Sequence, residues 1–190
     1  MTDLRRSAWQ YNTGAGGSVS VGPLSASRGL IALDDPSGKP KRFDIATFGI
    51  GWNVMRLPAK LRLPDIPLPR AVFKGNSLAG SGSSSDFIAT GWVYINHTFT
   101  GNELKESDFE GGACSIEMGG GVLVAGSITA MYVGIPVQLM MAAIANPMFS
   151  RLALNAAKAV VILLGVSEGL MDGIGATASV GALTYRGDYA

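Results

Sequence analysis

The first third of the chain alternates apolar residues with small or polar ones, a pattern typical of β-strands. Residues 18–25 alternate Val and Leu with Ser and Gly, and residues 29–33 are apolar up to Asp34-Asp35-Pro36-Ser37-Gly38. Asp, Pro, Ser and Gly favour a tight turn. Residues 42–52, rich in Phe and Ile, then suit the return strand. The pattern therefore predicts a β-hairpin around the turn at residues 34–38.

Further strands are expected after a proline-rich connector. Residues 57–69 contain four prolines, which lack the amide donors of a β-ladder, so we interpret this segment as an extended surface spacer. Residues 86–100 and 113–118 have the aromatic and β-branched composition of strands. We therefore predict a β-rich body over residues 18–118, sandwich or barrel-like, preceded by an N-terminal arm at residues 1–17.

The C-terminal region is unusually apolar. Residues 119–135 carry no charge, and a helix of this length would measure about 26 Å, the short end of a membrane span. The apolar composition continues after Pro136, and residues 152–166 carry only Lys158 as a charge. The same residues also suit a buried strand and a core helix of a water-soluble protein. The expected fold class is α+β, with an apolar, Gly/Ala-rich, membrane-active helical segment over residues 119–190.

Small residues recur at every fourth position in two parts of this region. They are Gly126, Ala130 and Gly134 in the first part, and Gly165, Gly169 and Gly173 in the second. Residues four apart share one face of a helix, and small residues there allow close packing of helices in lipid. We predict that these six residues pack helices in a membrane. Glu168 and Asp172, also four apart beside the second stripe, would line an oligomeric pore that favours cations.

Charge excludes some functions and suggests one internal contact. Fifteen basic and fourteen acidic residues leave a net charge of +1, which argues against a nucleic-acid binder. Residues 1–74 have a local charge of +6 and residues 75–118 of −5, so these two blocks can attract each other. The acidic run Glu103, Glu106, Asp108 and Glu110 is either a solvated loop or a partner for the basic half of the chain.

The sequence offers few residues that could form a catalytic or metal-binding site. One cysteine, Cys114, and one histidine, His97, exclude an internal disulfide, a cysteine cluster and a multi-histidine metal site. The segment Gly75-x-Ser77-x-x-Gly80 misses the spacing of a serine nucleophile elbow by one residue. We therefore expect no enzyme activity, no cofactor and no metal. The N-terminal residues lack the apolar core of a secretory signal, so we expect export by another route.

Several short motifs carry a resemblance to a known family. They are Asp35-Pro36-Ser37-Gly38-Lys39 with Phe43, Gly49-x-Gly51, Val93-Tyr94-Ile95, Gly101-Asn102-Glu103-Leu104 with Asp108, and Thr129-Ala130-Met131 before Gly134. In these motifs, between about residues 18 and 136, the chain resembles small bacterial proteins that include pore-forming type VI secretion effectors. The resemblance implies an antibacterial toxin carried inside the ring of the hemolysin-coregulated protein. It also implies a membrane-embedded immunity protein in the producing cell.

Two functions from different classes therefore stand at this point. The leading hypothesis is an antibacterial effector, cytoplasmic before export, that inserts into the inner membrane of a target cell. There it would form an oligomeric, cation-favouring pore that dissipates ion gradients. The alternative is a soluble structural or binding module whose apolar C-terminal segment is a buried core or subunit interface.

Overall fold

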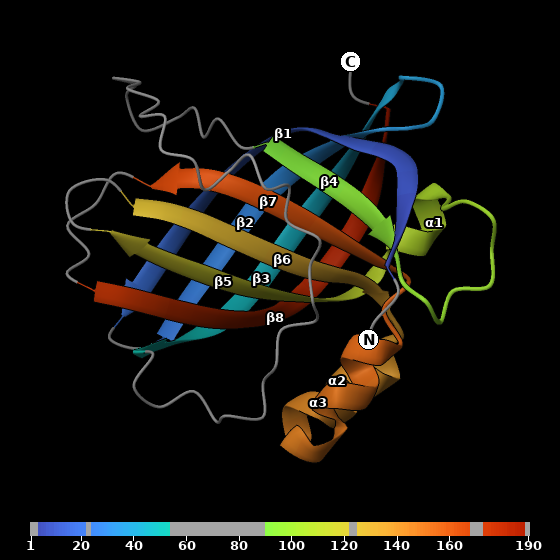
Figure 1. Cartoon of the computed structure of the whole chain (residues 1–190). Coiled ribbons are helices and arrows are strands. Elements are labelled where there is room, and N and C mark those ends of the chain that lie inside the picture. Colours follow the sequence, from blue (N-terminus) through green and yellow to red (C-terminus); the bar gives the residue numbers. More distant parts are fainter. Residues whose placement is uncertain (1–3, 22–23, 54–89, 122–124, 168–172, 189–190) are drawn as a thin grey trace.

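The fold is a single closed β-barrel, seen in a computed structural model that describes residues 4–21, 24–53, 90–121, 125–167 and 173–188 (Figure 1). Its antiparallel strands close in the order β1-β2-β3-β8-β5-β6-β7-β4. The strands are β1 (Arg5–Val21), β2 (Leu24–Asp34), β3 (Pro40–Asn53), β4 (Thr90–Ile95), β5 (Gly111–Gly121), β6 (Ala125–Ile135), β7 (Ala159–Ser167) and β8 (Gly173–Asp188). The helices are α1 (Glu106–Phe109), α2 (Val137–Ala145), the 3-10 turn η3 (Pro147–Phe149) and α3 (Ser150–Asn155).

The α+β expectation is wrong, because the apolar C-terminal region supplies half of the barrel. Strands β5 to β8 come from residues 111–188, and α2, η3 and α3 lie between β6 and β7. Gly, Val, Thr and Ile dominate these strands, and β-branched residues fit a pleated surface better than a helix. The boundary expected at residue 118 falls inside β5, and the proline-rich connector at 57–69 lies outside the described residues.

The predicted hairpin at residues 29–52 is confirmed as strands β2 and β3. Asp34 pairs with Pro40, and the turn between them is held by Asp35, whose carboxylate accepts hydrogen bonds from the Ser37 and Lys39 amides. Gly38 has a φ of 80°, a left-handed conformation that glycine adopts without a side-chain clash. Local turn chemistry therefore sets the register of this pair.

The barrel interior is filled with large apolar side chains at one end. Every strand contributes to this inner cluster, which includes Phe43, Leu33, Val93 and Val133, all 0–1 % exposed. Phe109 of α1 closes the end, and its ring lies 4.9 Å from that of Trp9 and 5.4 Å from that of Phe43. We call this end, with α1, the closed end.

A second apolar cluster lies on the outside of the barrel. It uses the alternate residues of strands β4 to β7, such as Tyr94, Tyr132 and Ile162, because successive residues of a strand face opposite sides. Met140 of α2 and Ala153 of α3 pack into the same cluster, so the two helices cover part of the outer surface. The strands therefore carry apolar residues on both faces in this region.

Candidate functional site

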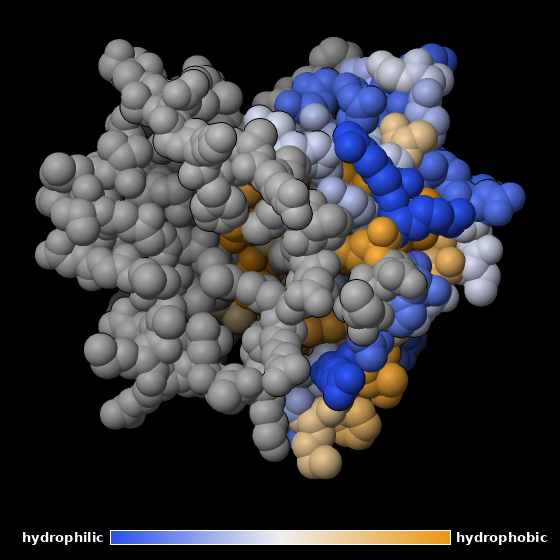
Figure 2. All heavy atoms as spheres, viewed as in Figure 1, coloured by the Kyte–Doolittle hydropathy of each residue, from blue (hydrophilic) through white to orange (hydrophobic). Residues whose placement is uncertain are grey.

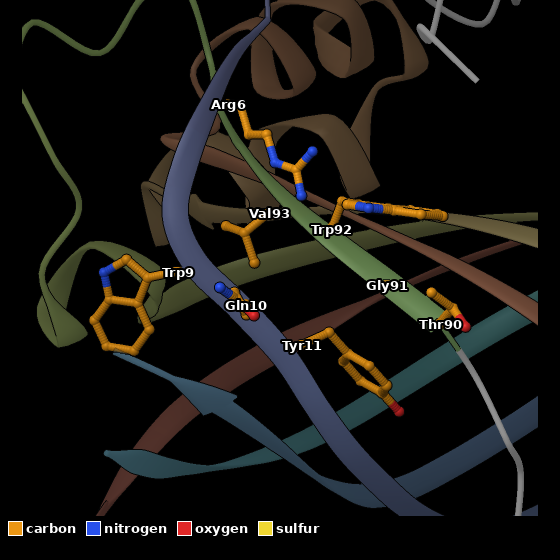
Figure 3. Close-up of a pocket in the computed structure, with 8 residues that line it drawn as sticks. All are labelled: Arg6, Trp9, Gln10, Tyr11, Thr90, Gly91, Trp92 and Val93. Atoms are coloured by element: carbon orange, nitrogen blue, oxygen red, sulfur yellow. The ribbon is translucent and has the colours of Figure 1, made fainter. Parts of the chain in front are cut away.

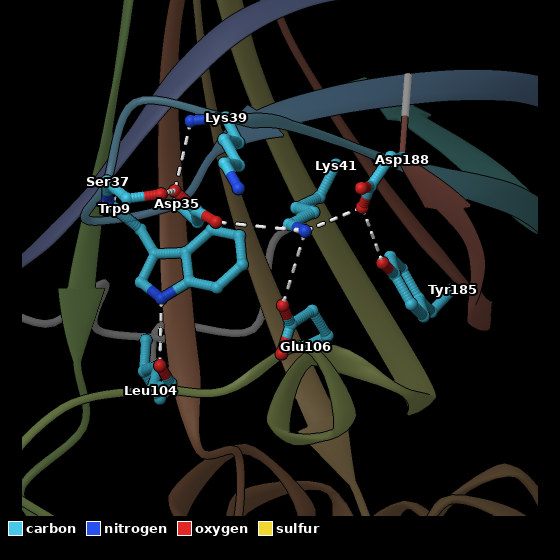
Figure 4. A network of polar contacts seen from close by, with 9 residues as sticks. All are labelled: Trp9, Asp35, Ser37, Lys39, Lys41, Leu104, Glu106, Tyr185 and Asp188. Atoms are coloured by element: carbon cyan, nitrogen blue, oxygen red, sulfur yellow. Dashed lines mark hydrogen bonds and ion pairs between the residues drawn. The ribbon is translucent and has the colours of Figure 1, made fainter. Parts of the chain in front are cut away.

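Charged side chains gather at the closed end of the barrel, around Lys41 (Figure 4). The Lys41 ammonium lies 2.6 Å from Asp188, 3.7 Å from Asp35 and 3.8 Å from Glu106. The hydrogen bond to Asp188 raises the pKa of Lys41 and lowers the pKa of Asp188. The pKa of Asp35 is lowered too, chiefly by the hydrogen bond from the Ser37 hydroxyl. This network ties β3, β8 and α1 together.

The acidic run makes contacts within the chain. Glu106 reaches Lys41 of the basic N-terminal block, which confirms the expected attraction between the two blocks. Asp108 pairs with Lys158 at 2.9 Å. Burial alone would raise the pKa of Glu103, but hydrogen bonds from the Ser7 hydroxyl and the Ala8 and Leu104 amides lower it overall. The run is therefore structural at this end of the barrel.

The opposite end of the strands is nearly free of charge. The last charged residue of β3 in this direction is Asp44, which leaves nine uncharged residues to Asn53. Strand β8 is uncharged from Gly173 to Tyr185, and β6 and β7 carry no charge at all. We call this part of the barrel the uncharged end.

Toward the uncharged end, the inner positions change from apolar to small and polar. Four neighbouring strands place hydroxyl residues in the same alternation as the inner apolar cluster. These residues are Thr47 of β3, Ser179 of β8, Ser115 of β5 and Thr129 of β6. Their register partners continue the pattern, since Ser115 pairs with Ser179 and Thr47 with Gly181. The inner face is therefore polar where the strands lose their charges.

The outer positions of the same strands are apolar. Phe48 of β3 follows Thr47 and is 53 % exposed. Ile128, Leu164 and Val180 occupy the corresponding outer positions of β6, β7 and β8. Polar inner positions combined with apolar outer positions reverse the pattern of a water-soluble barrel and are typical of strands that face lipid. We take this part of the barrel as the candidate functional site.

The residues predicted to pack in a membrane fall on strands. Gly126, Ala130 and Gly134 lie on β6, where a spacing of four also keeps one face, and Ala130 is buried in the outer cluster. Gly165 lies on β7 opposite Ser127, so it belongs to the other face from Gly126. Gly173 begins β8. These residues do not share one helical seam.

The remaining predicted site residues are not placed. Gly169, Glu168 and Asp172 lie outside the described residues, between β7 and β8. The sequence-based prediction did not include the hydroxyl residues at the inner positions. Alternation of residue types with a period of two in residues 125–133 and 174–183 is the pattern that could have indicated them.

Among the described segments, no helix combines the length and apolar character needed to cross a bilayer.

A cavity of about 350 Å³ lies at the seam between β1 and β4 (Figure 3). The pairing shifts there, because Arg6 pairs with Tyr94 and Gln10 with Trp92, which leaves two more residues on β1 than on β4. The lining residues are Arg6, Trp9, Gln10, Tyr11, Thr90, Gly91, Trp92 and Val93. Among these described lining residues there is no histidine, cysteine or carboxylate.

Comparison with known proteins identifies the family. No family model matches the chain, and no solved structure matches it significantly. The chain is 32 % identical over 190 residues to the toxin protein Tse4 of Pseudomonas aeruginosa, and the alignment covers 95 % of each protein. This similarity supports the coarser part of the expectation from sequence, an antibacterial toxin effector of the type VI secretion system. At this identity and coverage, the chain belongs to the family of the toxin protein Tse4.

Proposed function

We propose that this toxin permeabilises the inner membrane of a target bacterium by inserting the uncharged end of its barrel as an ion-conducting pore. The observation that carries the proposal is the reversed pattern at that end. Thr47, Ser115 and Thr129 hold inner positions, and Phe48 and Val180 hold outer ones. An ion path needs polar walls, and lipid needs an apolar outer surface.

The barrel also meets the backbone requirement of a bilayer. Lipid cannot hydrogen-bond exposed amides and carbonyls, so only helices and closed barrels cross it without cost. A tilted transmembrane strand needs about 9–11 residues. The uncharged stretches of β3 and β8, residues 45–53 and 173–185, meet this length. The charged network around Lys41 would then remain outside the hydrocarbon.

Small inner residues matter because an eight-stranded barrel is narrow. Large inner side chains fill such a barrel completely. Inner positions near the uncharged end carry Gly, Ser and Thr, as at Gly181, Ser179 and Ser115. Strands instead of packed helices are thus the basis of the proposed pore, and the apolar filling of the closed end, with Phe43 and Phe109, has to move aside for ions to pass along the whole barrel.

The pore should favour cations. Glu117 of β5 pairs in register with Thr129 and Thr177, and it follows Ser115 by two residues in the alternation of that strand. One carboxylate at such a position attracts cations and repels anions in a narrow polar path. Glu168 and Asp172 stay predicted pore residues. Carriage by the hemolysin-coregulated protein ring, a membrane immunity protein and self-association in the membrane also stay predictions.

A leakage experiment tests this function with a matched pair of variants. Ser179→Leu enlarges an inner position, and Ala178→Leu enlarges the neighbouring outer one. Vesicles loaded with potassium should leak with the unmodified protein and with Ala178→Leu, whereas Ser179→Leu should leak about tenfold more slowly. Equal leakage from both variants would remove the barrel interior from the mechanism. Vesicles left intact by the unmodified protein would favour the alternative, a soluble binding module with a buried apolar C-terminal segment.

A further inference from the structure

We propose that α2, η3 and α3 form a docking element that lies flat in the headgroup region of an anionic phospholipid bilayer. This inference deepens the proposed membrane activity and rests on it. The element covers residues 137–155 and follows β6 after the single residue Pro136.

An exposed apolar surface is the main observation. Among the described residues, large hydrophobic side chains are exposed at seven positions, and six of them belong to this element. The six are Val137, Met141, Ile144, Met148, Phe149 and Leu152, between 43 % and 86 % exposed. Figure 2 shows orange surface at the lower edge of the molecule, where α2 and α3 lie in Figure 1. This apolar surface faces away from the barrel.

The opposite face of the element is already occupied by the barrel. Met140 of α2 and Ala153 of α3, 5 % and 2 % exposed, pack against the outer cluster with Tyr132 and Ile135. Asn96, the residue after β4, donates a hydrogen bond to the Ala157 carbonyl just after α3, at 2.8 Å. The element is therefore fixed to the barrel wall with its apolar side outward.

Charge complementarity favours an anionic lipid surface as the partner. The sequence contains no Asp or Glu between residues 118 and 167, and the only basic residues there are Arg151 and Lys158. Lys158 pairs with Asp108, whereas Arg151 of α3 is exposed and forms no ion pair with a described residue. An uncharged apolar patch with a basic residue at its side suits the acyl–phosphate boundary of a bilayer.

The position of the element along the barrel agrees with a location at the acyl–phosphate boundary. Its first residue, Val137, lies two positions after Ile135, at the end of β6 near the charged contact between Asp108 and Lys158. The apolar outer face that we assign to lipid, with Ile128, begins on the same strand. The patch therefore continues the proposed lipid-facing surface at the border between the uncharged and the closed ends. A membrane interface has this arrangement of apolar and polar surroundings.

Binding to sedimented vesicles tests the proposal. Vesicles of phosphatidylethanolamine and phosphatidylglycerol are compared with vesicles of phosphatidylcholine alone. Met148→Glu places a charge on the most exposed residue of the patch and should weaken binding to the anionic vesicles by about tenfold. Ser107→Glu, an equally charged change at an exposed position of α1, should bind as the unmodified protein does. Arg151→Gln should weaken binding to the anionic vesicles alone.

A second variant reports the depth of the patch without adding charge. Met148→Trp should show a blue shift of its emission, relative to the unmodified protein, when anionic vesicles are added. Acyl chains brominated near the headgroup should quench that emission more strongly than chains brominated near the methyl end. Emission unchanged by vesicles would overturn the proposal.

Other outcomes separate this proposal from the pore. Unchanged vesicle binding by Met148→Glu would overturn the docking element even if potassium leakage continued. Loss of a dimer in Met148→Glu, with lipid binding intact, would assign the patch to a second copy of the chain instead. Vesicles that bind the unmodified protein through the patch but do not leak would refute the pore and leave the docking element standing.

Discussion

Asn96 shows how a single buried polar side chain connects two parts of this molecule. It is 2 % exposed, and its amide donates to the carbonyls of Leu154, Asn155 and Ala157 at the end of α3. Carbonyls at the end of a helix have no partner within the helix, so a side chain must satisfy them when they are buried. Asn96 thereby joins β4 to the helical element.

Removal of this amide should destabilise the fold. We expect Asn96→Ala to lower the free energy of unfolding by about 1–3 kcal/mol, because buried carbonyls lose their partner. Urea unfolding followed by circular dichroism measures the change. Asn102→Ala, at an exposed position of the loop that follows, is the control and should stay within about 0.5 kcal/mol of the unmodified protein. An equal effect at both positions would contradict the role of Asn96.

The ion network at Lys41 predicts how stability depends on pH. The pKa values of Asp35 and Asp188 are lowered in the fold, so their contribution exists above their ordinary pKa and is lost as pH falls through the folded pKa. The pKa of Lys41 is raised, so its contribution is lost as pH rises through its folded pKa. We expect the melting temperature to decrease when the pH is lowered below about 4. Asp188→Asn should show a smaller acid-induced fall, and an identical fall would contradict this assignment.

At the scale of elements, the backbone conformation near the end of β6 explains why residue 134 is a glycine. Gly134 has a φ of 69°, and a Cβ atom there would collide with the Asp108 carbonyl of α1. Gly38 has a similar φ of 80° but no atom within 4 Å of such a Cβ. The requirement for glycine at Gly134 therefore arises from the contact between β6 and α1, independently of any membrane.

Alanine substitutions at Gly38 and Gly134 distinguish the cost of backbone strain from the cost of a steric collision. Gly38→Ala adds strain alone and should lower the free energy of unfolding by about 1 kcal/mol. Gly134→Ala adds the collision and should cost more than about 2 kcal/mol. Thermal unfolding of the two variants side by side provides the comparison. Equal losses would mean that α1 moves aside without cost.

At the scale of the whole molecule, the distribution of charge gives the barrel two different ends. One end carries the network of Lys41, Asp188 and Glu106. The other carries hydroxyl and glycine residues inside and mostly apolar residues outside, with the exposed Arg28 of β2 as an exception. A barrel with this polarity can enter a bilayer from one end only, because the charged end would pay a large desolvation cost. The proposed pore and the docking element on α2 and α3 both depend on this direction.

The preference of the proposed pore for cations over anions can be tested on the whole barrel. Because Glu117 follows Ser115 by two residues in the alternation of β5, Glu117→Gln should lower the ratio of cation to anion permeability severalfold. The reversal potential across a planar bilayer under a potassium chloride gradient measures this ratio. Glu110→Gln, at the closed end where Glu110 accepts from the Tyr185 amide, should leave it unchanged. An unaltered ratio in Glu117→Gln would exclude Glu117 from selectivity.

Sequence reasoning found the parts of this molecule that depend on neighbouring residues. The turn at residues 34–38 and the strands beside it were predicted correctly, because Asp35 and Gly38 determine the turn locally. The charge-free C-terminal region was also visible in the sequence. The helical interpretation of Gly126, Ala130 and Gly134 was wrong because residues four apart share one face in a helix and in a strand alike.

Composition and local chemistry thus determined the hairpin, the contrast between charged and uncharged regions, and the family motifs. Only the tertiary structure decided that the chain closes into a barrel, because closure depends on pairs far apart in sequence. Strand β3 pairs with β8 and β1 pairs with β4, and the Lys41–Asp188 contact spans 147 positions of the chain. No local pattern specifies such partners, and the inner and outer faces of the strands exist only once those pairs have formed.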